Sequence, residues 1–174
     1  MTRLLAWALL ATLLFAPGLT AARGRDPLTS DEIDQLREAA VEPEKRLKLL
    51  ADFARLRLTV IEETRTPKKP EAENARSLHD LMEDFLAVYD ELDENIEMYE
   101  DRKSDLRKAL KIVLLADGEF RARLDGLQHN LTSQEKTDCD FVLSSIMESV
   151  NSGTSEHRKL LAEQEASAKN KKKN

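Results

Sequence analysis

Apolar residues recur at every seventh position through the middle of the chain. The repeat comprises Leu78, Phe85, Leu92, Tyr99, Leu106, Val113, Phe120 and Leu127. Such a repeat is typical of the buried face of a coiled coil or a long helical hairpin. The position three residues later is apolar at Leu81 and Val88 but polar at Asn95 and Arg102, whereas a two-stranded parallel coil needs it apolar throughout. The pattern therefore favours antiparallel packing in a bundle.

A hairpin requires the chain to turn back within this repeat, and two places qualify. Residues 101–104 form a polar stretch without glycine or proline, and Asp117-Gly118 lies further along. Glycine is the residue type that most often ends a helix. Gly118 is therefore the better helix breaker by residue type, and both places stay open as the position of the turn.

Two segments predict helix starts. Thr29 with Glu32 forms a capping box, in which the threonine side chain and the glutamate three residues later satisfy each other's free backbone N–H groups. Thr132 with Glu135 repeats the arrangement. The first of these helices is expected to end near Glu42, because Pro43 disfavours helical geometry in the residue before it.

The remaining helices are predicted from helix-breaking residues and from the spacing of apolar residues. Pro43 suits a first helical position and predicts a helix to about Glu63, followed by a proline-containing linker at residues 65–71. The helix after Thr132 is expected to end at Asn151-Ser152-Gly153, and a last helix to begin at Thr154 or Ser155.

These elements predict an all-α protein: an elongated helical bundle or helical hairpin of four to six helices. Residues 23–168 form the expected single helical domain, and residues 169–174, rich in lysine, are expected to be a disordered basic tail.

The first 22 residues have the pattern of a cleavable signal peptide. Arg3 precedes an uncharged run over residues 4–16, which is shorter than the roughly 20 apolar residues needed to cross a membrane. Thr20 and Ala22 supply small residues for cleavage, so the mature chain is expected to start at Arg23, with cleavage after Ala21 as an alternative. An uncleaved anchor is the other interpretation. The protein is expected to be exported, to the periplasm or extracellular space, without a stable anchor.

Composition limits the partners. The chain has 27 Lys and Arg against 33 Asp and Glu, a net charge of −6, which becomes −7 once Arg3 is removed with the signal peptide. An acidic protein has no general attraction for nucleic acid. Only 5% of the residues are aromatic, which favours thin helix-on-helix contacts over a thick globular core.

Candidate chemistry is sparse, and no catalytic, cofactor or metal residue is predicted. The spacings typical of zinc, di-metal and serine-hydrolase sites do not occur in the sequence. Cys139, the only cysteine, is interpreted as a buried helix residue or, alternatively, as an intermolecular disulfide. Asn130 begins the sequon Asn-Leu-Thr, a glycosylation acceptor in a eukaryotic secretory pathway, although Thr132 also serves as a cap.

Acidic residues dominate the segment 80–101, which contains ten carboxylates and neither lysine nor arginine. Such a face is typical of a solvated helix paired with basic helices of the same chain. The alternative is a cation site or a docking face for a basic partner.

The segments Leu28-Thr29-Ser30-Asp31-Glu32 and Leu131-Thr132-Ser133-Gln134-Glu135 resemble the paired Leu-Thr-x-x-Gln motifs of the Spy-like periplasmic stress chaperones, with glutamate in place of glutamine. The resemblance implies a small, exported, all-helical protein that binds unfolded clients. From the residues themselves, we expect a non-enzymatic structural or interaction protein that binds a protein partner, or itself, through its helix faces.

Overall fold

The computed structural model describes residues 26–65 and 76–171, and helices account for 87% of them, without a strand among them. The predicted all-α class and helical bundle are confirmed. Five helices follow in order: α1 (Ser30–Glu38), α2 (Pro43–Thr64), α3 (Leu78–Asp101), α4 (Arg107–Asn130) and α5 (Ser133–Lys171). The predicted signal peptide, and the linker beyond Arg65, lie outside the described residues.

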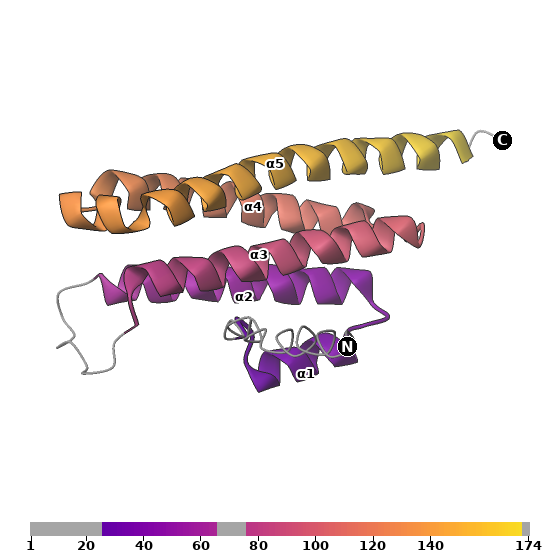
Figure 1. Ribbon diagram of the computed structural model, residues 1–174. Helices are drawn as coiled ribbons and strands as arrows, with labels where there is room; N and C mark the ends of the chain where they lie inside the picture. Colours follow the sequence, from indigo (N-terminus) through magenta and orange to yellow (C-terminus); the bar gives the residue numbers. More distant parts are fainter. Residues whose placement is uncertain (1–25, 66–75, 172–174) are drawn as a thin grey trace, which may run out of the picture.

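The four long helices form a bundle, and α1 packs on α2 alone (Figure 1). Around the bundle the order is α2, α3, α5, α4, so the consecutive helices α3 and α4 lie on a diagonal. Because successive helices reverse direction, α3 and α5 run parallel as neighbours. Contacts of Tyr89 with Gly153 and of Asp93 with His157 show this parallel register.

Both predicted capping boxes form, and α1 and α5 begin at them. The Thr29 side chain accepts from the Glu32 N–H at 3.2 Å, and Glu32 accepts from the Thr29 N–H at 2.8 Å. At the start of α5, the equivalent distances between Thr132 and Glu135 are 3.3 Å and 2.7 Å. Pro43 is the first residue of α2, also as predicted.

The sevenfold repeat supplies the core. Seven of its eight residues, from Phe85 to Leu127, are buried, and Leu78 at the start of α3 is partly buried. Leu78 to Tyr99 of the repeat lie on α3 and Val113 to Leu127 lie on α4, while Leu106 is the residue that precedes α4.

Of the two places left open for the turn, the structure uses the first. The chain reverses between Asp101 and Arg107, where Lys103 adopts a left-handed backbone with φ of 58°. Gln164 on α5 stabilises this loop, since its side chain accepts from the Leu106 N–H at 2.8 Å and donates to the Ser104 carbonyl at 3.1 Å. Gly118 lies exposed within α4, where intrahelical hydrogen bonding continues through it.

The predicted break at Gly153 is wrong, because α5 is one helix of 39 residues. Tertiary packing keeps Gly153 helical, and it is buried against α3. The helix continues through Lys171, so residues 169–171, expected in the tail, are helical; lysines there suit the negative end of the helix dipole. Among the described residues, no helix is long and apolar enough to cross a membrane.

Replacing Gly118 with alanine is expected to stabilise the protein. A Cβ atom built at Gly118 has nothing within 4 Å, and the helix loses the conformational cost of glycine. The free energy of unfolding in urea should rise by about 0.5–1 kcal/mol for G118A. A decrease would contradict an uninterrupted, exposed helix at this position.

Candidate functional site

A cluster of polar side chains lies in the interior of the bundle, where α3, α4 and α5 meet. We call Tyr89, Asp93, Asp117 and His157 the charged cluster. Tyr89 and Asp93 are four residues apart on α3, and so lie on one face of that helix. Gly153 and His157 repeat this spacing on the parallel helix α5, so each α3 residue meets one α5 residue at its own level.

His157 contacts a carboxylate with each of its ring nitrogens. Nδ1 lies 2.9 Å from Oδ2 of Asp117, and Nε2 lies 3.1 Å from Oδ1 of Asp93. A neutral imidazole has a proton on one nitrogen only and would point a lone pair at one of these oxygens. The doubly protonated imidazolium offers a donor to both carboxylates at once, and only 3% of the residue is exposed.

The charges in the cluster shift the pKa values in consistent directions. Burial by itself lowers the pKa of His157, but its hydrogen bonds and attraction to Asp117 and Asp93 raise it overall, to about 9. The pKa of Asp93 is raised by burial and by repulsion from Asp117 and Glu156, against the lowering effect of His157. Oδ1 of Asp93 is buried and has no hydrogen bond of good geometry, so its contact with His157 is mainly an ion pair.

Tyr89 provides the second hydrogen bond to the Asp117 carboxylate. Its hydroxyl donates to Oδ1 of Asp117 at 3.0 Å, which leaves the other oxygen for His157. Both Tyr89 and Asp117 are fully buried. Burial and the negative charges of Asp117 and Asp93 raise the pKa of Tyr89 far above its usual range, so it remains a neutral donor.

Gly153 allows this arrangement because it leaves room beside the tyrosine. A Cβ atom at Gly153 would lie 2.6 Å from the Tyr89 hydroxyl oxygen and 3.0 Å from Oδ2 of Asp93. Only a residue without a side chain lets α5 approach α3 this closely.

The cluster is enclosed rather than open. It combines one cation with two carboxylates, and only Asp93 has a substantially exposed side chain, at 31%. The two hollows described on the surface are lined by other residues. The arrangement can hold helices together and exchange a proton with solvent through Asp93.

The residues singled out in the sequence lie elsewhere. Cys139 is buried in α5 at 2% exposure, as the interpretation of a buried helix residue expects. Burial, together with Asp138 and Glu135, raises the pKa of its thiol, which disfavours the reactive thiolate. Asn130 is exposed at the end of α4 and donates to the Gly126 carbonyl at 2.8 Å.

Acidic residues of segment 80–101 are partly paired within the chain. Arg76 lies 2.6 Å from Asp84, Arg46 of α2 lies 3.8 Å from Glu91, and His157 pairs with Asp93. These contacts agree with the interpretation of a helix face paired with basic residues of the same chain.

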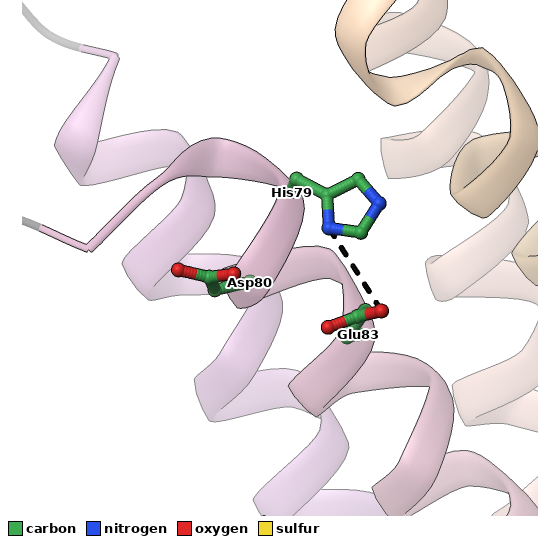
Figure 2. A group of neighbouring side chains, drawn as sticks. All are labelled: His79, Asp80 and Glu83. Carbon is green, nitrogen blue, oxygen red and sulfur yellow. Dashed lines mark ion pairs between the residues drawn. The ribbon is translucent and has the colours of Figure 1, made fainter. Parts of the chain in front are cut away.

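At the start of α3, His79, Asp80 and Glu83 bring possible ligand atoms within 4.8 Å of one another. Figure 2 shows these side chains on the first turns of α3, with an ion pair of 3.8 Å joining His79 to Glu83. The His79 side chain is 40% exposed and that of Glu83 is 61% exposed. Acidic side chains here also suit the positive end of the helix dipole, and we assign the group no site.

Sequence reasoning missed the charged cluster. Its members are far apart in the chain, and metal or hydrolase spacings do not describe them. One signal was present: His157 continues the apolar stripe of Cys139, Ile146 and Val150 at helical spacing, which places a histidine on the buried face.

The chain is thus an all-α protein in which four long helices form a bundle and a buried imidazolium lies between two carboxylates. Comparison of the chain with protein-family models, curated proteins and solved structures finds no match.

Replacing Gly153 with alanine is expected to destabilise the bundle by about 1–3 kcal/mol, because the new methyl group overpacks the site against Tyr89. Urea unfolding followed by circular dichroism measures the effect, with G118A as the matched control. In a Y89F background, which lacks the hydroxyl, the cost of G153A should be smaller. An equal cost in both backgrounds would contradict this contact as the cause.

Stability is expected to depend on pH through His157. Because folding raises its pKa from 6.5 to about 9, its stabilising contribution is complete below pH 6.5 and is lost as the pH rises through 9. The wild-type free energy of unfolding should fall over this range by up to about 3 kcal/mol. The pKa of Asp93 is also raised by folding, so its contribution to stability is likewise lost as the pH rises, starting at a lower pH.

The matched variant is H157Q, which has no charge to lose. Its stability should be lower than that of the wild type at pH 6.5, and the two should converge above pH 9. Parallel pH profiles for wild type and H157Q would show that His157 does not carry the charge.

Proposed function

We propose that the mature chain is an exported, non-enzymatic protein that binds a protein partner through its helix faces. Export is inferred from the signal pattern of residues 1–22. A catalytic role is not favoured, because the polar groups of the charged cluster face one another and are enclosed by three helices.

The observation that carries the proposal is the length of α5. With 39 residues it is roughly 58 Å long, against roughly 36 Å for the 24 residues of α4. Its carboxyl-terminal end therefore extends beyond the loop between α3 and α4 (Figure 1). Most residues from Ala162 to Lys171 are exposed, so this end offers a helix surface to another molecule.

A groove of about 390 Å³ lies between this end of α5 and the loop after α3. Leu160 and Ala168 contribute apolar surface to it. Charged side chains of both signs surround them: Glu100, Asp105, Glu163, Lys103, Arg107 and Lys171. Mixed charge around apolar surface fits a protein partner better than nucleic acid or an anionic membrane, each of which attracts mainly cations.

A second candidate is a chaperone for unfolded exported clients, favoured by the two Leu-Thr-x-x-Glu segments. In the structure both glutamates form caps, and each also binds an arginine: Glu32 binds Arg57 at 2.6 Å, and Glu135 binds Arg65 at 3.1 Å. These roles account for the segments without a client. Suppression of the aggregation of a reduced model substrate by the purified protein would favour the chaperone.

Site-specific photo-crosslinking tests partner binding at the end of α5. With benzoylphenylalanine in place of Ser167, illumination of the cells that export the protein should give a discrete heavier adduct. The matched control places the same group at Ser144, exposed in the first part of α5. No adduct, or the same adducts from both positions, would contradict a binding surface at the end of α5.

A further inference from the structure

We propose that the charged His157 fastens the carboxyl-terminal half of α5, residues 154–171, to the bundle, and that loss of this charge releases that half while the rest of the bundle remains folded. Release of this half does not depend on any partner.

The first half of α5 is held by apolar burial. Its buried side chains are Cys139, Val142, Leu143, Ile146 and Val150. Each buried aliphatic side chain contributes about 1.5–3 kcal/mol, so this half is well anchored without any charged contact.

The second half has much less apolar support. After Val150, Leu160 is the one large apolar side chain of α5 among the buried residues, and Leu161 is partly buried. Its other attachments are polar: His157 to Asp93 and Asp117, Gln164 to the loop after α3, and Glu165 to Lys111 at 2.9 Å. The last of these is an exposed ion pair, which adds little.

His157 is therefore the main attachment of this half, and its strength depends on charge. Neutral His157 would keep at most one donor hydrogen, leaving one buried carboxylate oxygen facing a lone pair. Segments with little apolar burial open locally before the whole protein unfolds. Opening of residues 154–171 returns Asp93 and His157 to water, which offsets the loss of their contact.

The groups that face His157 all belong to the helices packed around it. Helix α3 contributes Asp93 and the neutral Tyr89, and the charge of Asp90 raises the pKa of Tyr89. Helix α4 contributes Asp117, and Glu156 is the neighbouring residue on α5 itself. The carboxylates among them favour the imidazolium, and the tyrosine stays protonated. Titration of His157 is thus the change that weakens the attachment as the pH rises.

Amide hydrogen exchange measured by mass spectrometry at pH 7 tests the proposal on the purified exported protein. In H157Q, exchange in residues 158–171 should accelerate roughly ten- to a hundredfold, the size expected for loss of hydrogen bonds to a charged group. Exchange in residues 139–150 should change far less. The matched control is H129Q, because His129 is exposed on α4 and, within residues 26–65 and 76–171, its hydrogen bond is to the Asp125 carbonyl of its own helix; it should exchange like the wild type.

A fluorescence measurement keeps the proposal testable if H157Q does not fold. Met147 and Leu161 are both partly buried on α5, on either side of Gly153. The L161W emission, after subtraction of the parent spectrum, should shift to longer wavelength as the pH rises from 7 to 10, the range over which His157 loses its charge. M147W should not shift. An unchanged L161W spectrum, equal shifts in both variants, or accelerated exchange spread evenly through α5 in H157Q would each overturn the proposal.

Discussion

The position of His157 between Asp117 and Asp93 is the constraint to which the rest of the bundle adapts. Asp117 is completely buried, and an unpaired carboxylate in that position would be very costly. It is tolerated because its two oxygens are used by separate donors, Tyr89 from α3 and His157 from α5. One residue of α4 thereby fixes the positions of two other helices.

Arg57 attaches the short helix α1 to the bundle. Arg57 of α2 binds Glu32 of α1 with both side chains nearly buried, and it also donates to the Pro27 carbonyl at 2.7 Å. Burial raises the pKa of Glu32, but Arg57 and the Thr29 backbone lower it overall, so the pair stays ionised. Removing one partner of a buried pair leaves an uncompensated charge, so this contact holds α1 more firmly than the exposed pairs along the surface can.

Features that depend on interactions between residues close in the chain were predictable from the sequence, and features that depend on tertiary contacts were not. Thr29 with Glu32, and Thr132 with Glu135, satisfy their own backbone over three residues, so their helix starts were predictable. The heptad positions from Phe85 onward were predictable as core because helix periodicity is also local. The helix end predicted at Gly153 was wrong, and the turn was left open between residues 101–104 and Gly118, because a glycine ends a helix only when tertiary contacts allow it, and here α4 and α5 continue through them. The charged cluster escaped prediction for the same reason, since His157 meets Asp117 across 40 residues of chain.

The charged cluster also resolves an ambiguity that apolar packing leaves open. Along α5 the apolar stripe repeats about every seven residues, so sliding α5 by one heptad against α3 would preserve much of the hydrophobic contact. In one direction Val150 would face the two carboxylates and Ile146 would take the place of Gly153 beside Tyr89. In the other direction Gln164 and Leu160 would occupy those places. Either slide buries carboxylates without a cation and forces a large side chain into a gap that accepts only glycine, so the observed register is specified by charge and by space together.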